Sequence, residues 1–179
     1  VFITEITDPQ NSSTAGRYVE LYNSGSAEVD LSSGWSLQRW TNGNADPQTP
    51  KDLTGTIPAG GFYIICNDDA KFSATYGFDA SQDIGTGGPA DSNGDDNIAL
   101  LDAAGTIVDM FGVPGEAGSA SNGHSFEDGR AERVATVTSG SSTWDAAEWD
   151  IDNDSGAGDG NLYAPEGYDA GSWIGALGD

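Results

Sequence analysis

Arg17-Tyr18-Val19-Glu20-Leu21-Tyr22-Asn23 is the stretch that decides the fold. In it the apolar residues Val19 and Leu21 flank the charged Glu20, and the run ends at a residue type common in turns. Alternation with a period of two, bounded by turn residues, is typical of a β-strand that buries one face. The stretch therefore predicts a strand with one side packed against a core.

The same pattern recurs along the chain, with short runs of this kind separated by turns rich in Gly, Asn, Asp and Pro. No long amphipathic helix is visible, and only Thr143 to Trp149 could form a turn or two of helix. The other predicted strands are Val1–Thr7, Trp35–Trp40, Gly61–Asn67, Asn97–Asp102, Thr106–Phe111 and Arg133–Thr138. Strands at this spacing, without helical crossovers, predict one all-β domain, an antiparallel sandwich or barrel.

The composition changes after about residue 112. Residues 112–129 are rich in Gly and Ser, residues 150–160 form a Gly/Asp loop, and tryptophans occur at wide intervals. Buried aromatic side chains can hold long loops against a sheet. We therefore expect a core of residues 1–112 and a long irregular C-terminal extension, residues 113–179, packed on the same domain.

The chain is strongly acidic, because its 179 residues carry 29 Asp and Glu against 6 Lys and Arg, a net charge of −23. Such a charge opposes contact with nucleic acid or an anionic membrane, since both are polyanions that need a basic patch. No run approaches the roughly 20 apolar residues of a membrane helix. We expect no membrane insertion and rank direct nucleic-acid binding last. Arg130 and Arg133 are expected to anchor the extension to the sandwich.

One cysteine and one histidine limit the chemistry of the chain. Cys66 ends the apolar run Phe62–Cys66 and has no partner for an intramolecular disulfide, so we expect a small buried residue. His124 has none of the common nucleophile or metal-ligand motifs around it. Metal-dependent hydrolases combine carboxylates with a catalytic His. A lone His in a loop therefore leads us to expect no catalytic site.

Calcium binding is the stronger functional prediction. The loop Asp150–Asn161 places aspartates at alternate positions on a Gly-rich backbone, and hard oxygen ligands of this kind suit calcium. A standard calcium hand is excluded, because Ser155 replaces its required Gly and Asn161 its bidentate Glu. An irregular Ca²⁺ site and a plain flexible loop both stay open. The ligands predicted in this loop are Asp150, Asp152, Asp154 and Asp159.

A second loop, Asp91–Asn97, offers Asp91, Asn93 and Asp95 as further calcium ligands. The alternative is a tight turn that leads into the next strand, because Asx side chains hydrogen-bond to their own backbone. We prefer the turn for this loop. The cofactor predicted for the chain as a whole is Ca²⁺.

Trp40 is the candidate for ligand binding through an aromatic ring. It lies beside Arg39 and before the turn Asn42-Gly43-Asn44, where an exposed ring could stack on a sugar or a base. Trp35 and Leu37, by contrast, alternate as core residues do. Trp40 therefore supports an alternative function, a module that binds glycans or a cell surface through exposed aromatics.

A series of short motifs occurs in a characteristic order along the chain. These motifs are Val1–Ile6, Arg17–Asn23, Val29–Leu31, Gly34–Leu37, Leu53–Ile64, Asn97–Asp102 and Gly105–Asp109. Together they resemble a bacterial lamin tail domain, over residues 1–112. The resemblance implies an immunoglobulin-like β-sandwich, which agrees with the strands predicted from alternation.

Phe126–Arg133 is similar to a segment that follows this domain in large secreted bacterial nucleases, and Trp173-Ile174-Gly175 is similar to the end of that region. The resemblance implies an extracellular, non-catalytic module of such a nuclease or a related hydrolase. Its partners would be the other domains of the same polypeptide, and a glycan or cell surface. We therefore expect a calcium-binding accessory module with a stabilising or positioning role; the glycan- or surface-binding module is the alternative.

Overall fold

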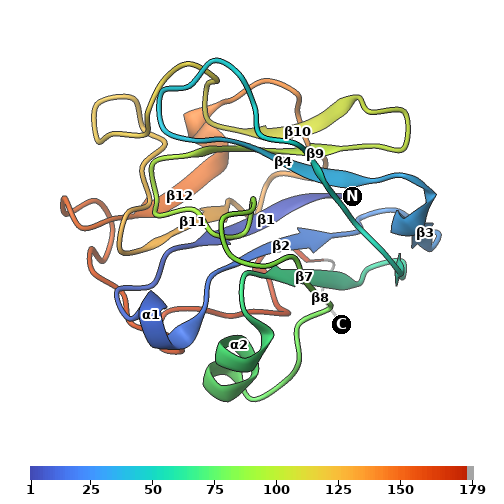
Figure 1. The fold of residues 1–179 in the computed structure, drawn as a ribbon, viewed down its shortest axis with the longest axis horizontal. Helices are drawn as coiled ribbons and strands as arrows, with labels where there is room; N and C mark the ends of the chain where they lie inside the picture. Colours follow the sequence, from blue (N-terminus) through green and yellow to red (C-terminus); the bar gives the residue numbers. More distant parts are fainter. Residues whose placement is uncertain (177–179) are drawn as a thin grey trace.

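Two packed β-sheets, with two short helices on the outer side of one of them, form the protein in the computed structural model, which describes residues 1–176 (Figure 1). The last three residues of the expected extension, 177–179, lie outside the described residues. The strands are β1 Phe2–Thr7, β2 Tyr18–Tyr22, β3 Val29–Asp30, β4 Ser36–Trp40, β5 Lys51–Asp52, β6 Thr56–Ile57, β7 Phe62–Cys66, β8 Gln82–Asp83, β9 Asn97–Leu101, β10 Ile107–Phe111, β11 Arg130–Arg133 and β12 Trp149–Asp152. The helices are α1 Ser12–Ala15 and α2 Asp69–Tyr76, and the 3₁₀ turns are Leu31–Ser33 and Ala146–Glu148.

The first layer is a six-stranded sheet with the order β12-β11-β1-β2-β7-β8, and the second is a four-stranded sheet with the order β10-β9-β4-β5. Strands β3 and β6 form a separate two-stranded ribbon. Paired strands are antiparallel, except for the parallel pair β7 and β8. The predicted all-β, immunoglobulin-like antiparallel sandwich is confirmed. No helix within residues 1–176 has the length and apolar character needed to cross a membrane.

The predicted strands between Val1 and Phe111 each contain an observed strand, but the prediction for Arg133–Thr138 is wrong. The strand in this region is β11, and it ends at Arg133. β11 pairs with β1 on one side and β12 on the other, whereas most of residues 134–138 are exposed. β-branched residues favour a strand only where a partner is present.

Helix α2 is a further difference, because the sequence predicts no helix at this position. The Asp68 side chain caps its start by accepting the Lys71 N–H at 3.1 Å, and Gly77 ends it in the left-handed conformation at φ 81°. Phe72 is its one buried residue, with its ring 5.6 Å from that of Tyr18. A helix that is held by its capping residues and one buried ring has no periodic pattern of apolar residues, so the sequence does not indicate it.

The extension is less irregular than expected, since β11 and β12 continue the six-stranded sheet beyond β1. Phe126, Ala131 and Trp149 of the extension belong to the same buried cluster as Ile3 and Leu37. The extension thus completes one side of the sandwich core.

Arg130 and Arg133 anchor the extension, as the sequence predicts. The Nη2 atom of Arg133 lies 2.5 Å from Oδ2 of Asp109 on β10, and its Nε donates to the carbonyl of Ile3. The Nη1 atom of Arg130 lies 3.3 Å from Oε1 of Glu5 on β1. Both arginines therefore join the extension to strands of the core.

Candidate functional site

A β-bulge in β1, between Ile3 and Glu5, shifts its register against β2. Glu5 thereby stands opposite both Glu20 of β2 and Glu132 of β11, and Glu132 stands opposite Asp150 of β12. Residues directly opposite each other point to the same face of a sheet. These four acidic residues form one line across the outer face of the six-stranded sheet, which we call the acidic row.

Burial falls along the acidic row. Glu20 and Glu5 are 0% and 1% exposed, Glu132 is half-buried, and Asp150 is exposed. The C-terminal segment covers the buried end, where the Gly171 N–H donates to Oε2 of Glu20 at 2.7 Å. Because like charges opposite each other destabilise a sheet, the buried members require neutralisation.

Arg130 is the cation of the acidic row. Its guanidinium lies 3.0–3.5 Å from carboxylate oxygens of Glu5, Glu132, Asp152 and Asp169. Burial acts to lower the pKa of Arg130, but the surrounding carboxylates, Glu5 above all, outweigh it and raise that pKa above its usual value. One guanidinium thus serves four carboxylates, which leaves an excess of acidic groups.

The two buried glutamates retain protons more strongly than ordinary carboxyls. Burial raises the pKa of Glu5 to about 8, although the hydrogen bond with the Tyr18 hydroxyl acts in the opposite direction. Burial also raises the pKa of Glu20 well above its usual value, in spite of hydrogen bonds from Thr4 and Gly171. The acidic row therefore has a covered, proton-holding end at Glu5 and Glu20 and a more exposed end at Asp150.

An open pocket of about 430 Å³ lies beside the exposed part of the acidic row. Its lining residues are Arg130, Glu132, Gly167, Tyr168, Asp169 and Ile174. Carboxylates beside a guanidinium and a tyrosine ring can hydrogen-bond a small hydroxylated or cationic ligand. This pocket was not predicted, because its walls come from β11 and from a segment more than 30 residues further along the chain.

The second predicted calcium loop uses its first aspartate within the fold. The carboxylate of Asp91 accepts hydrogen bonds from Arg17 at 3.0 Å, from Asn67 at 2.7 Å and from the Gly87 N–H at 2.6 Å. Asn93 is exposed. Asp91 therefore joins three segments of the core, a role that spacing alone does not reveal.

The first predicted loop begins as a strand, so the expected loop from Asp150 is wrong for its opening residues. Asp150 and Asp152 lie in β12 because it pairs with β11, and Asp154 and Asp159 follow in turns. Oδ1 of Asp152 accepts the Asp159 N–H at 2.6 Å, and its Oδ2 lies 3.5 Å from Nε of Arg130. Alternating aspartates in this stretch thus reflect, in part, the period of a strand.

Asp95 and Asp154, one from each predicted loop, both lie near Glu127. Next to Asp95, the Gly94 carbonyl accepts the N–H of Phe126 at 2.9 Å, and the Asp154 N–H donates to the Glu127 carbonyl at 2.7 Å. Burial first, then Asp154, Asp128 and Asp95, raise the pKa of Glu127. Within residues 1–176 no three His, Cys, Asp or Glu side chains are grouped to hold a metal ion. Calcium stays a prediction.

His124 and Cys66 are both buried. The His124 ring centroid lies 5.8 Å from that of Trp144 and 6.4 Å from that of Phe111, in edge-on contacts. Cys66 is buried, as predicted, and burial raises the pKa of its thiol to about 12. Both side chains contribute to packing.

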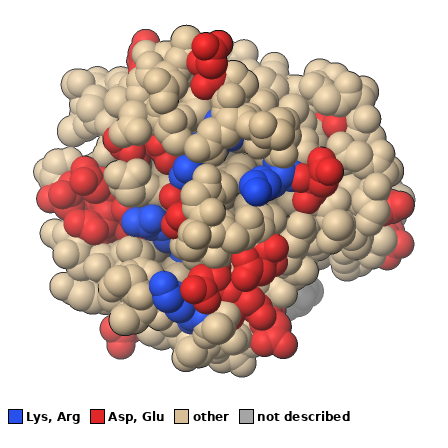
Figure 2. All heavy atoms as spheres, viewed as in Figure 1, with Lys and Arg blue, Asp and Glu red and all other residues tan. Residues whose placement is uncertain are grey.

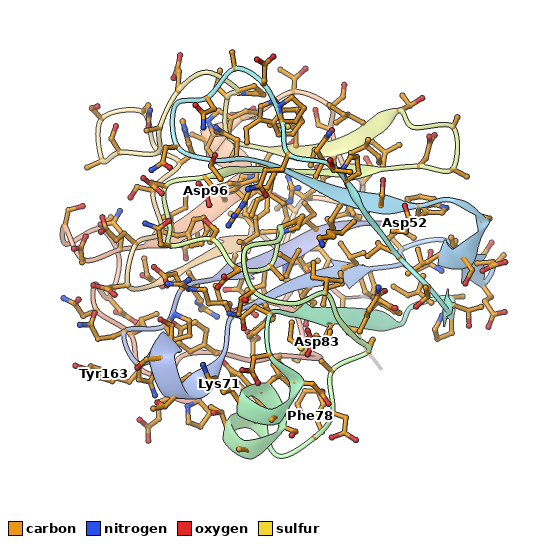
Figure 3. All side chains as sticks on the ribbon, viewed as in Figure 1. Asp52, Lys71, Phe78, Asp83, Asp96 and Tyr163 are labelled. Atoms are coloured by element: carbon orange, nitrogen blue, oxygen red, sulfur yellow. The ribbon has the colours of Figure 1, made fainter. Side chains whose placement is uncertain are left out.

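Trp40 is buried, which removes the alternative of an exposed ring at this position. It is 6% exposed and packs against apolar side chains that β9 and β10 supply on the same face of the four-stranded sheet. The exposed aromatic rings are Phe78, at 42%, and Tyr163, at 54%. Both lie at the periphery of the molecule (Figure 3).

Comparison with known proteins gives one family. The family model described as Lamin Tail Domain matches residues 1–115, which is more than half of the chain and extends from β1 to just beyond β10. Domains of this kind are immunoglobulin-like and non-catalytic. No curated protein matches the chain.

Proposed function

The chain belongs to the lamin tail domain family, and from this premise we propose that it is a non-catalytic accessory module of a secreted bacterial nuclease or related hydrolase. In this proposal the module acts outside the cell. It stabilises or positions the other domains of the same polypeptide.

The observation that carries the proposal is that every arginine of the chain forms an ion pair within the fold. The shortest pair for each is Arg17–Asp8 at 2.7 Å, Arg39–Asp96 at 3.2 Å, Arg130–Glu132 at 3.0 Å and Arg133–Asp109 at 2.5 Å. Figure 2 shows the result on one face, where the basic side chains lie beside acidic ones. A module with this surface repels polyanions and would leave a nucleic-acid substrate to a neighbouring catalytic domain.

Calcium enters the proposal through Asp95 and Asp154, although within residues 1–176 no three acidic side chains are grouped to hold a metal ion. The two aspartates come from different loops, and both act to raise the pKa of Glu127. Oδ1 of Asp95 is buried and has no hydrogen-bond partner among the described residues. A divalent cation would relieve the repulsion between these carboxylates, with backbone carbonyls and water as its remaining ligands.

A calcium titration by calorimetry, together with thermal unfolding at roughly millimolar calcium, tests the metal part of the proposal. We expect calcium to raise the melting temperature, because it binds the folded state. The double variant Asp95→Asn/Asp154→Asn should abolish that rise, whereas Asp46→Asn, at an exposed position in another loop, should preserve it. No heat of binding and an unchanged melting temperature in the wild type would remove calcium from the proposal.

The accessory role is tested by separating this chain from its neighbouring domains. We expect the isolated chain to cleave neither DNA nor RNA, with or without divalent cations, and to give no gel shift with either. Attached to the catalytic domain of the same reading frame, it should raise that domain's melting temperature or activity. Turnover by the isolated chain would contradict the proposal.

Binding of a glycan or a cell surface is the second candidate function. It is favoured by the exposed rings of Phe78 and Tyr163 and by the pocket beside Arg130. A glycan array should then give a hit that Tyr163→Ala or Phe78→Ala weakens. An array without hits would remove this candidate.

A further inference from the structure

The last described part of the chain, residues 162–176, lies against the outer face of the six-stranded sheet, and we call it the C-terminal strap. Figure 1 shows this end of the chain passing on the side of the sheet where α1 and α2 lie. The Tyr168 hydroxyl donates to the Gly129 carbonyl at 3.1 Å, and the Trp173 indole N–H donates to the Arg133 carbonyl at 2.5 Å. The Trp173 ring lies 5.5 Å from that of Phe2. The strap is held as well by two hydrogen bonds that Asn11 exchanges with the backbone of Ala164, at 2.9 and 3.0 Å, and by the packing of Ala164 and Tyr168 against Ala15.

Beneath the strap, Glu5 and Glu20 stand opposite each other on neighbouring strands, both almost fully buried. Arg130 reaches Glu5, but the donors to the Glu20 carboxyl are neutral: the Thr4 hydroxyl at 2.6 Å and the Gly171 N–H at 2.7 Å. An ionised carboxylate in such surroundings is costly unless a charge compensates it. Docking of the strap therefore favours the protonated form of this pair.

The groups around the pair do not supply that charge. Those that act on Glu5 or Glu20 are Tyr18 from β2, Tyr76 from α2, Arg130 and Glu132 from β11, and Tyr168 and Asp169 from the strap. Arg130 is the one cation in this set, and it also contacts Glu132, Asp152 and Asp169. With both glutamates ionised, one guanidinium would face an excess of carboxylates.

We propose that the Glu5–Glu20 pair is a proton-operated lock for the C-terminal strap: protonated, it holds the strap on the sheet, and loss of its protons releases the strap. Release exposes the outer face of β1 and β2. The device goes beyond the accessory role, because it makes the covering of this face depend on pH.

The direction of the pH effect on docking follows from the linkage between proton binding and docking. In the docked state burial raises the pKa of Glu5 to about 8, whereas in water a glutamate titrates near its ordinary value of 4.5. Between these values the docked state binds more protons than the released state, so docking weakens as pH rises. Docking is strongest below the ordinary pKa of glutamate. The part of the docking free energy that depends on protonation is lost once the pH has passed the raised pKa of Glu5. The docking constant should fall by up to about tenfold per pH unit for each carboxyl.

Hydrogen exchange measured by NMR tests the lock. The exchange rates of the Gly171 amide and of the Trp173 indole N–H report opening of the strap. Each observed exchange rate, divided by the intrinsic exchange rate of that group, gives the opening constant. For the wild type we expect this constant to rise at least about tenfold between pH 6 and pH 8. The amide of Ile65, in the buried strand β7, should show no such rise, which separates strap release from global unfolding.

The double variant Glu5→Gln/Glu20→Gln keeps both side chains uncharged and should make the opening constant independent of pH. Glu166→Gln, the same change at an exposed position on the strap, should behave as the wild type. A pH-independent constant in the wild type, or an equal rise in the double variant, would overturn the proposal.

Infrared spectroscopy of the wild type gives a second test that needs no variant to fold. The carbonyl stretch of a protonated carboxylic acid should be present near neutral pH and disappear above about pH 9. Absence of that band at neutral pH would also overturn the lock.

Discussion

Arg133 of β11 and Asp109 of β10 form a buried ion pair that joins the two sheets of the sandwich. Their side chains are 1% and 0% exposed, and Nη2 and Oδ2 are 2.5 Å apart. Asp109 also accepts the N–H groups of Ile3 and Ser141, at 2.8 and 3.0 Å. An ion pair at this depth offsets its desolvation because hydrogen bonds satisfy its remaining polar atoms.

Arg133→Met should lower the free energy of unfolding by about 3–5 kcal/mol, because it leaves Asp109 buried without its counter-ion. Urea unfolding measures the change. Addition of Asp109→Asn should recover part of the loss. Lys71→Met is the control, since Lys71 pairs with Asp68 at 3.7 Å on the surface and should change stability by no more than about 0.5 kcal/mol. If Arg133→Met and Lys71→Met lowered the free energy of unfolding by the same amount, the anchoring role of Arg133 would be contradicted.

Trp40→Ala should lower the free energy of unfolding by about 3–5 kcal/mol, because it empties a packed site on the four-stranded sheet. Tyr163→Ala removes a ring that is 54% exposed and should cost no more than about 0.5 kcal/mol. Thermal or urea unfolding of both variants is the measurement. A stable Trp40→Ala protein would show that the ring is not a packing residue.

Asp91 should contribute stability that depends on pH. Burial acts to raise its pKa, but hydrogen bonds from Gly87, Asn67 and Arg17 outweigh burial and hold the pKa below its usual value. A depressed folded pKa contributes stability above the unfolded pKa, and this stability is lost as pH falls through the folded pKa.

Asp91→Asn should therefore lower the free energy of unfolding by about 1–3 kcal/mol near neutral pH, and by less below about pH 3. Urea unfolding at both pH values tests this. The same loss at each pH would mean that the Asp91 charge is not involved.

Cys66 should resist a thiol reagent in the folded protein at about pH 8 and react fully in denaturant. It is buried, and burial raises the pKa of its thiol to about 12, so little thiolate forms and the reagent has no access. Colorimetric titration of the thiol with and without denaturant is the measurement. Rapid reaction in the native state would contradict the burial.

Local patterns account for what could be predicted of the fold. The stretch Arg17–Asn23 contains β2, with Val19 and Leu21 in the core and Glu20 on the other face, as alternation requires. The family motifs end near β10, and beyond them the position of β11 was predicted wrongly. Strand position in that region depends on pairing with β1, which no local pattern records.

The candidate sites were predicted less well, because they join distant segments. Alternating acids pointed to Asp152 and Asp91, and the structure adds that both form hydrogen bonds and ion pairs within the fold; their binding of calcium stays a prediction. The acidic row was not predicted, since it depends on a bulge in β1 that aligns Glu5 with Glu20 and Glu132. Nothing in the spacing of these glutamates indicates that they share one line.

The sequence by itself determined the all-β class, the positions of the strands that have five or six residues and the net charge of −23. Each depends on residue type and on neighbours within a few positions. Only the tertiary structure decided which acids are buried, which are paired and which have a raised pKa. Those properties depend on desolvation and on charges brought together across the sheets, which residues far apart in the chain create only once it has folded.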